Sequence, residues 1–337
     1  MLQVSLETPG RVVAGEVAAA RAAEGLALVR VQRIGVCGTD LHAFRGRQPF
    51  FTYPRVLGHE LGVEVIDPGG GAGGLRAGDR CAVEPYLNCG TCVACRHGRS
   101  NCCVSLSVLG VHEDGGMREV IAVPPEKLHV SYRLSCEKLA LVETLAIGAH
   151  AVERAGLTRG EFVLVIGAGP IGLSVVQFAL ASGARVAVMD ANPARLDLCR
   201  TRWNVPHVID ARSPTAQADV IEAGGGDLPT AVFDATGNPE SMGASFRWPC
   251  AGGRLIFVGL VQGDIAFNDP EFHRRELTLL ATRNARPETF RAIIDAIESG
   301  RIDTEPWITH RLALGDVTAQ FPALAVAPDL FKAMISV

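Results

Sequence analysis

The chain has 337 residues, of which 48% are hydrophobic and 20% are charged. This composition is typical of a folded protein, and the length favours about two domains. The formal net charge of −4 gives no basic excess for binding nucleic acid or an anionic membrane surface. No apolar stretch is long enough to span a bilayer, and residues 1–9 lack the pattern of an export signal. We therefore expect a cytoplasmic protein whose ten cysteines are reduced or bind metal.

The first part of the chain, residues 1–145, is predicted to form many short strands. Apolar or alternating runs at 12–13, 26–31 and 63–66 are bounded by glycine, proline and other turn residues. Residues 69–74 are mostly glycine but lack the Lys-Ser/Thr pair of a P-loop, so we interpret them as a solvated turn. This part of the chain is therefore expected to be rich in β-structure.

After Glu143 the pattern changes, and apolar runs alternate with helical segments. The continuous apolar run at 162–166 is typical of a strand buried on both faces of a parallel sheet. Alternating strands and helices predict right-handed βαβ units and a doubly wound α/β fold. Further strands are expected at 186–190, 207–209, 230–234, 254–258 and 277–280.

A further helix is predicted beyond residue 284. Pro287 opens this helix and Gly300 ends it. Its single apolar face, which we expect to pack in the core, carries Phe290, Ile293, Ile294 and Ile297.

A dinucleotide-binding motif, Gly167-Ala168-Gly169-Pro170-Ile171-Gly172, follows the strand at 162–166. The first glycine makes a tight turn, the second lets the backbone approach a pyrophosphate, and the third lets helix pack on strand. The start of the following helix supplies amides for the phosphates. Asp190 ends the next strand, where a carboxylate binds the adenosine ribose and repels a 2′-phosphate. The motif therefore predicts NAD rather than NADP, although Arg195 is near enough to meet a phosphate; Arg195 and Thr236 complete the expected cofactor-binding set.

Cys37, His59 and Glu60 form a candidate catalytic metal site. A thiolate, an imidazole and a carboxylate are side chains that bind a catalytic zinc, which also needs an open position for water or substrate. Each could instead be a separate structural residue, but their occurrence with a nucleotide motif and a cysteine cluster favours the metal site. Glu60 is expected to be a ligand or a close neighbour. Glu143 could face the same site or be a solvated helix carboxylate.

Three further polar residues lie near these ligands in the sequence. Thr39 and His42 follow Cys37 by two and five residues, and we expect them in a proton path. His150 is expected to be a packed or interfacial histidine.

Four cysteines with the spacing Cys89-x-x-Cys92-x-x-Cys95-x₇-Cys103 predict a second metal site. Four thiolates leave no open position, which describes a structural zinc in a closed tetrahedral site. Cys102 is a rival for the fourth ligand, and we choose Cys103 for its spacing. An iron–sulfur cluster is the other use of clustered cysteines, but the spacing does not match the ferredoxin runs. We interpret the remaining cysteines as ordinary buried residues, namely Cys81, Cys136, Cys199 and Cys250.

Together these motifs resemble the zinc-containing medium-chain dehydrogenase/reductase superfamily. The resemblance covers nearly the whole chain and rests on residues 37–42, the Gly58-His59-Glu60 triplet, the four-cysteine lobe and the glycine motif with its later aspartate. It implies a GroES-like β-rich catalytic domain, residues 1–145 and 284–337, and a Rossmann NAD-binding domain, residues 146–283, with the active site in the cleft. It also implies a homodimer or homotetramer that pairs through an edge strand near residues 277–281.

Within this superfamily the chain resembles the polyol, threonine and sugar-acid branch, because Glu143 stands where simple alcohol dehydrogenases carry cysteine. Residues 48–56, 108–116 and 282–285 are similar to stretches of bacterial L-galactonate and L-gulonate 5-dehydrogenases. The chain departs from the branch at two places. Val63 replaces a usual glycine, with Gly62 one place early, and Thr144 replaces a common proline.

This resemblance implies zinc-dependent, NAD-linked oxidation of a secondary hydroxyl to a ketone by hydride transfer on a small molecule, namely a sugar acid. Such a substrate needs a cation for its carboxylate, and Arg283 and His112 are the candidates. Asn284 and Glu113 are candidates for its hydroxyls, although all four residues could equally be ordinary loop residues. The alternatives are an L-threonine, sorbitol or general secondary-alcohol dehydrogenase, and a non-catalytic NAD-binding regulator, against which the metal ligands argue.

Overall fold

The computed structural model describes residues 1–21, 24–48, 51–70 and 74–337. It divides into two compact units, one made of residues 1–144 and 286–337 and the other of residues 145–285. Residues 49–50 of the stretch at 48–56, and residues 71–73 of the glycine-rich turn, lie outside the described residues. Within the described ranges, no helix is both long and apolar enough to cross a membrane.

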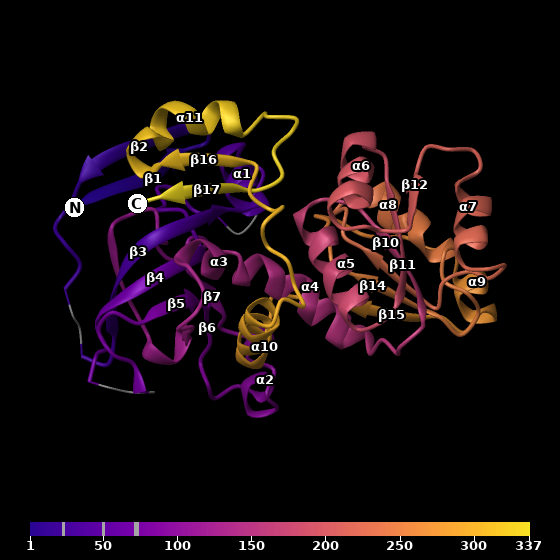
Figure 1. The fold of residues 1–337 in the computed structure, drawn as a ribbon, viewed down its shortest axis with the longest axis horizontal. Coiled ribbons are helices and arrows are strands. Elements are labelled where there is room, and N and C mark those ends of the chain that lie inside the picture. The colour runs from indigo at the N-terminus through magenta and orange to yellow at the C-terminus, as the bar shows by residue number, and fades with distance from the viewer. Residues whose placement is uncertain (22–23, 49–50, 71–73) are drawn as a thin grey trace. The chain divides into compact units, whose positions relative to one another are not determined.

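A seven-stranded sheet forms the framework of the first unit and pairs the C-terminal strand with a strand from the first forty residues (Figure 1). The strand order is β16-β17-β3-β4-β5-β9, with β8 paired to β3. The C-terminal strand β17 pairs antiparallel with β3 and parallel with β16. The strands of the sheet are β3 (Ala27–Val36), β4 (Glu60–Asp67), β5 (Arg80–Val83), β8 (Val120–Val123), β9 (Leu128–Val130), β16 (His310–Ala313) and β17 (Ala333–Ser336).

Two smaller pairs of strands and several helices complete this unit. The strand pairs are β1 (Leu2–Thr8) with β2 (Arg11–Glu16), and β6 (Tyr86–Leu87) with β7 (Ser107–Val108). The apolar face predicted for the helix that Pro287 opens, α10, is buried. The helices are α1 (Gly38–Phe44), α2 (Val93–Arg96), α3 (Cys136–Ala140), α10 (Pro287–Glu298) and α11 (Val317–Leu324), and the chain enters α4 (Val142–Ala155) before the second unit begins.

Gly62 explains one departure from the expected glycine pattern. It lies in β4, directly under the start of α3, where a Cβ atom would be 1.8 Å from the carbonyl oxygen of Cys136. Because no side chain fits in this gap, a glycine is required at position 62. Its neighbour Val63, which stands at the position where a glycine was expected, is fully buried in the core. Gly62 therefore provides the close approach of helix and strand one position earlier in the chain.

The second unit contains a six-stranded parallel sheet with the order β12-β11-β10-β13-β14-β15. All five residues of β10 are buried, as predicted for a central strand of a doubly wound sheet. The strands are β10 (Phe162–Ile166), β11 (Arg185–Asp190), β12 (His207–Asp210), β13 (Ala231–Asp234), β14 (Arg254–Phe257) and β15 (Thr278–Ala281). Helices alternate with them (Figure 1): α5 (Pro170–Ala181), α6 (Pro193–Arg202), α7 (Ala216–Ala223), α8 (Pro239–Ala244) and α9 (Asp269–Arg274).

The prediction that four isolated cysteines are buried is correct for Cys81 and Cys199 and wrong for Cys136 and Cys250, which are half-buried. Cys136 is the first residue of α3, and Cys250 lies in the turn before β14. Helix starts and turns lie at the surface more often than the apolar neighbours of a cysteine suggest.

Candidate active site and metal centres

Two neighbouring strands of the first unit bring Cys37 and His59 together. Cys37 follows β3 at the N-cap of α1, and His59 directly precedes β4, which pairs with β3. Gly58 turns the chain into His59 with a φ of 95°, a conformation that favours glycine. Candidate ligand atoms of Cys37, His59 and Glu60 all lie within 4.8 Å of one another. The thiol and imidazole of this group fit a zinc ion.

Asp40 lies beside the imidazole of His59. Its carboxylate is fully buried; Oδ2 accepts the Cys37 N–H at 2.8 Å, and Oδ1 lies 3.7 Å from Nδ1 of His59. That Nδ1 has no hydrogen-bond partner among the described residues, whereas the imidazole does bond to Cys37. Nε2 therefore faces Cys37, and the Asp40 carboxylate lies on the opposite side of the ring at ion-pair distance, where a carboxylate can support a metal-binding imidazole. In the sequence, Asp40 is recognisable only as part of the segment at 37–42.

Negative groups around His59 favour a cation at this place. Burial lowers the pKa of His59, but the Asp40 carboxylate and the Cys37 thiol outweigh burial and hold the pKa well above its ordinary value. Surroundings that attract a proton also attract a metal cation, which displaces the proton on binding.

Glu60 is engaged by a buried lysine that the sequence analysis missed. Nζ of Lys332 donates to Oε1 and Oε2 of Glu60 at 2.7 and 2.8 Å, and both side chains are almost completely buried. Burial raises the pKa of Glu60, but Lys332 and His59 outweigh it, so the pKa is lowered. Both carboxylate oxygens of Glu60 therefore bond to the ammonium, although Glu60 lies in the same group as Cys37 and His59.

Glu143 is buried rather than solvated, and its partner is Tyr86. The Tyr86 hydroxyl donates to Oε1 of Glu143 at 2.5 Å, and the two residues are 3% and 6% exposed. Burial and the Glu60 carboxylate raise the pKa of Glu143, against the opposing effect of His59. Glu143 lies outside the group of ligand atoms within 4.8 Å that the described residues form. A carboxyl group with a raised pKa beside a metal site can hold a proton during the reaction.

Thr39 and His42 lie on α1, three residues apart and therefore on one face of the helix. His42 lies near the surface, where partial desolvation and the cationic Arg45 and Arg47 lower its pKa. A neutral imidazole at the end of such a path can accept a proton.

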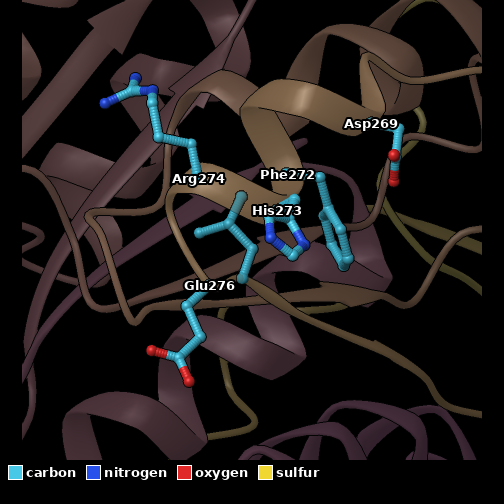
Figure 2. Close-up of a pocket in the computed structure, with 6 residues that line it drawn as sticks. Asp269, Phe272, His273, Arg274 and Glu276 are labelled. Atoms are coloured by element: carbon cyan, nitrogen blue, oxygen red, sulfur yellow. The ribbon is translucent and has the colours of Figure 1, made fainter.

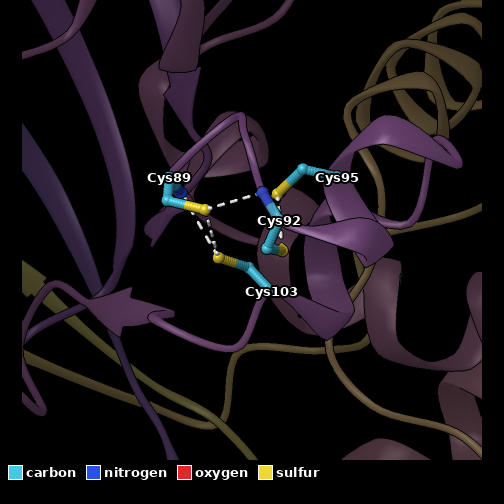
Figure 3. Close-up of side chains that lie close together, drawn as sticks. All are labelled: Cys89, Cys92, Cys95 and Cys103. Carbon is cyan, nitrogen blue, oxygen red and sulfur yellow. Dashed lines mark hydrogen bonds between the residues drawn. The ribbon is translucent and has the colours of Figure 1, made fainter.

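The four predicted cysteines Cys89, Cys92, Cys95 and Cys103 converge in one lobe (Figure 3). Their sulfur atoms lie within 4.8 Å of one another, whereas Cys102 is exposed and outside the group. Backbone N–H groups of Thr91 and Cys92 lower the pKa of Cys89 to about 6, which favours a thiolate. Four sulfurs from short, turn-rich segments fit a structural zinc with no open position.

A buried polar network lies next to this lobe. Asn88 Nδ2 donates to Cys95 Sγ at 3.7 Å, and Asn88 Oδ1 accepts from Lys127 Nζ at 2.8 Å. Lys127 also bonds to Glu84 at 2.5 Å, and Glu84 lies 3.1 Å from Nε2 of His129. Every charged group in this network therefore has a partner, as a buried charge requires.

The glycine motif of the second unit has the geometry of a phosphate-binding loop. Gly167 adopts a φ of 97°, and Gly169 is the N-cap of α5. At Gly172 a Cβ atom would lie 1.7 Å from the carbonyl oxygen of Gly167, so a side chain there would push helix and loop apart. Pro170 and Ile171 form the first turn of α5, where Pro170 has the fixed φ that suits a helix start.

The remaining predicted cofactor residues surround this loop. Asp190, the last residue of β11, accepts hydrogen bonds from the backbone N–H groups of Ala168 at 2.6 Å and of Asn192 at 2.7 Å. Arg195 Nη1 would lie 3.6 Å from a Cβ atom placed on Gly169. Thr236 packs beside Gly167 and is fixed by two hydrogen bonds to Asp234, from its N–H at 2.9 Å and its hydroxyl at 2.6 Å.

The four predicted substrate residues lie on loops of different units. In the first unit, Nδ1 of His112 accepts the Val108 N–H at 3.1 Å, and Glu113 accepts from the Ser107 hydroxyl at 2.6 Å. In the second unit, Arg283 and Asn284 follow β15, and Asn284 adopts a φ of 50°. Glu113 thus accepts a hydrogen bond through Oε1 within its own turn, and its contact with a substrate hydroxyl stays a prediction. His150 is buried in α4, as expected.

One surface hollow of about 530 Å³ lies against α9 (Figure 2). None of the predicted site residues lines it, and its lining residues are Asp269, Phe272, His273, Arg274, Glu276 and Leu277. We therefore assign it no role in the reaction.

Two family models match the chain. Residues 23–132 match the alcohol dehydrogenase GroES-like domain, and residues 170–299 match the zinc-binding dehydrogenase model. The L-galactonate-5-dehydrogenase of Escherichia coli K12 is 44% identical over 85% of this chain and 84% of that protein. Sorbitol dehydrogenase of Bacillus subtilis is 31% identical over 91% of this chain and 89% of that protein.

Among solved structures, the rspB alcohol dehydrogenase of Escherichia coli CFT073, complexed with NADH, superimposes with a TM-score of 0.92. It is 28% identical and matches 100% of this chain and 99% of that chain. The sequence motifs, the α/β fold with its six-stranded parallel sheet, and these similarities all indicate the same family. The chain belongs to the zinc-binding alcohol dehydrogenase family of the medium-chain dehydrogenases.

Proposed function

We propose that the protein oxidises a secondary hydroxyl of a sugar acid, of the L-galactonate or L-gulonate type, to a ketone with NAD as hydride acceptor. The observation that carries this proposal is the group formed by Cys37 and His59 with the buried Glu143–Tyr86 pair beside it. The similarity to an L-galactonate-5-dehydrogenase supports the choice of substrate class.

Cys37 Sγ and His59 Nε2 are the proposed protein ligands of the catalytic zinc, and Asp40 is proposed to support the imidazole. When bound, the zinc supplies Lewis acidity that favours ionisation of the substrate hydroxyl, and NAD supplies the hydride acceptor. Glu143 and Glu60 are the other acidic groups of the site. Glu60 is the weaker candidate for a ligand, because both of its oxygens bond to Lys332.

Two routes can remove the hydroxyl proton. One runs through the Thr39 hydroxyl to the imidazole of His42, whose lowered pKa keeps it neutral and able to accept. The other ends on Glu143, because a carboxyl group whose pKa is raised by burial takes up a proton more readily than an exposed one.

We propose that Gly167, Gly169, Pro170, Ile171 and Gly172 bind the NAD pyrophosphate, and that Asp190 binds the adenosine ribose. The proposal is supported by the position of Asp190 at the carboxyl end of β11, next to the loop whose N–H it already accepts. Arg195, whose guanidinium lies near Gly169, is proposed to neutralise phosphate charge. Thr236 is proposed to line the same loop.

For the substrate, we propose that Arg283 and His112 bind the carboxylate and that Asn284 contacts a hydroxyl. We expect Arg283→Ala to raise KM for an aldonate roughly tenfold or more, the effect of losing one charge-assisted contact. The KM for an uncharged secondary alcohol should stay unchanged. An unaltered aldonate KM in a normally folded variant contradicts the carboxylate role.

A neutral polyol is the second candidate substrate, favoured by the 31% identity to a sorbitol dehydrogenase. Threonine and simple secondary alcohols complete the set of alternatives. The metal assignment itself is tested by Cys37→Ser, which should lower the zinc content of the purified protein from about two ions per chain to about one. Retention of both ions would contradict Cys37 as a ligand.

We propose a homodimer or homotetramer that pairs through β15, in a cytoplasmic enzyme. β15 is the last strand in the sheet order, and Leu279 on it is 38% exposed. An unpaired strand edge with an exposed leucine is suited to pairing with another copy. A single monomeric mass by light scattering at micromolar concentration would contradict this state.

A further inference from the structure

Lys332 is a buried cation that touches three separate segments of the first unit. Its side chain is 2% exposed. Nζ donates to both oxygens of Glu60, to Oγ1 of Thr144 at 3.0 Å and to the carbonyl oxygen of Val36 at 3.3 Å. These acceptors come from the start of β4, the start of α4 and the end of β3.

Each of these acceptors is the sequence neighbour of a residue proposed for the active site. Val36 precedes Cys37, Glu60 follows His59, and Thr144 follows Glu143. One ammonium group therefore bonds to the three segments that must come together for the site to exist. None of the three contacts uses a proposed metal-binding atom of Cys37 or His59, so the ammonium can hold the segments with or without the metal.

We propose that Lys332 and Thr144 are positioning residues of the catalytic metal site. They hold the segments of Cys37, His59 and Glu143 in their positions relative to one another before the metal binds. This inference rests on the ligand assignment of the proposed function. It also gives a role to Thr144, whose hydroxyl accepts from Lys332 at 3.0 Å. A residue without a hydroxyl at position 144 could not make this hydrogen bond.

Burial explains why the tie is strong. A desolvated ammonium is stable only with acceptors around it, and a desolvated carboxylate only with donors. Lys332 and Glu60 satisfy each other, and Thr144 and Val36 supply the remaining acceptors. Movement of any one segment breaks a hydrogen bond in a place that water does not reach. The same bonds keep the oxygens of Glu60 directed at Lys332 and leave the metal to Cys37 and His59.

The test uses the full-length protein loaded with cobalt, because a cobalt–thiolate bond absorbs light and reports the ligand directly. The difference between the spectra of the parent and of Cys37→Ser defines the band that belongs to the catalytic site, separate from the four-cysteine lobe. Resistance of this band to a competing chelator is then compared in Lys332→Met, Lys332→Arg and Thr144→Val.

We expect Lys332→Met to lose the Cys37-dependent band at a chelator concentration at least roughly tenfold lower than the parent protein requires. This is the effect usual for residues that support metal ligands. Thr144→Val should show a smaller loss in the same direction, and Lys332→Arg should recover most of the resistance. Arg254→Met is the control, since it removes one partner of a largely buried ion pair, Arg254 with Glu161, in the second unit, whereas both metal sites lie in the first. Thr304→Val is the control for Thr144, because Thr304 is a buried threonine of the same unit. Both controls should retain the band.

Parent-like resistance in both Lys332→Met and Thr144→Val overturns the positioning role. If Lys332→Met fails to fold, Thr144→Val decides alone, since it adds no unpaired charge. Failure of the proposed function has a different signature: the Cys37→Ser spectrum then equals that of the parent, and no catalytic-site band exists.

Discussion

The Tyr86 hydroxyl donates a hydrogen bond to Glu143, and its removal should change the pH dependence of the reaction. The Tyr86 hydrogen bond lowers the pKa of Glu143, opposing the effect of burial. In Tyr86→Phe the pKa of Glu143 therefore rises, and the ionised fraction at a given pH falls. We expect the acidic limb of the kcat/KM profile to move to higher pH and the rate at neutral pH to fall roughly tenfold, the effect of one lost hydrogen bond to a charged group.

The pH profile of kcat/KM measures this directly. Tyr53→Phe is the control, because Tyr53 donates to the Ala43 carbonyl at 2.6 Å in the same unit without contacting Glu143. A Tyr86→Phe profile that superimposes on that of the parent would contradict the role of Glu143 as a proton acceptor.

Asp190 is expected to determine the preference for NAD over NADP. Without its negative charge, a 2′-phosphate is no longer repelled next to the glycine loop. We expect Asp190→Ala to lower the ratio of kcat/KM with NAD to that with NADP by roughly tenfold or more. Asp197→Ala, which removes an exposed carboxylate of α6, should leave the ratio unchanged. An unchanged ratio in Asp190→Ala refutes the ribose assignment.

Residues were predictable from the sequence where the chemistry lies in a short motif, as for Cys37, His59 and the four cysteines of the lobe. Asp40 stood inside such a motif, yet its role depends on the position of His59 in space. Lys332 and Tyr86 could not be found in this way. Lys332 is 272 positions from its partner Glu60, and nothing in its local sequence indicates that its side chain is buried.

Between elements, the close approach of α3 to β4 is the feature most open to a stability test. In Gly62→Ala the new methyl group would meet the Cys136 carbonyl at 1.8 Å, so strand and helix must separate. We expect a loss of about 1–3 kcal/mol in the free energy of unfolding, the usual cost of overpacking a core. Gly15→Ala in β2 is the matched control, because no heavy atom lies within 4 Å of its added Cβ.

Chemical denaturation of the two variants provides the measurement. Equal unfolding midpoints for Gly62→Ala and Gly15→Ala would show that α3 does not need this glycine. The need for Gly62 follows from the packing of α3 on β4. In the sequence alone, Gly62 is only a glycine one position before the expected one. The clash that requires it involves a residue more than 70 positions away.

For the whole molecule, the sequence predicted the α/β class because glycine motifs and continuous apolar strands are local signals. The pairing of the C-terminal strand with a strand from the first forty residues was implied only by resemblance. β17 pairs with β3 across most of the chain length, and single-strand patterns contain no information about such a partner. The substrate is harder still, because loops such as those of His112 and Arg283 have no regular pattern that connects residue type to ligand.

The proposed reaction is tested most directly by NAD reduction with the purified zinc-loaded enzyme. The substrates to compare are L-galactonate, L-gulonate, sorbitol, L-threonine and a simple secondary alcohol. We predict that one of the two aldonates is turned over with a kcat/KM at least about tenfold above the others, as expected when a charged group of the substrate is bound by a matching cation. A preference for sorbitol or threonine would contradict the sugar-acid assignment and leave the zinc dehydrogenase chemistry in place, whereas no turnover of any of the five would contradict the enzymatic account itself.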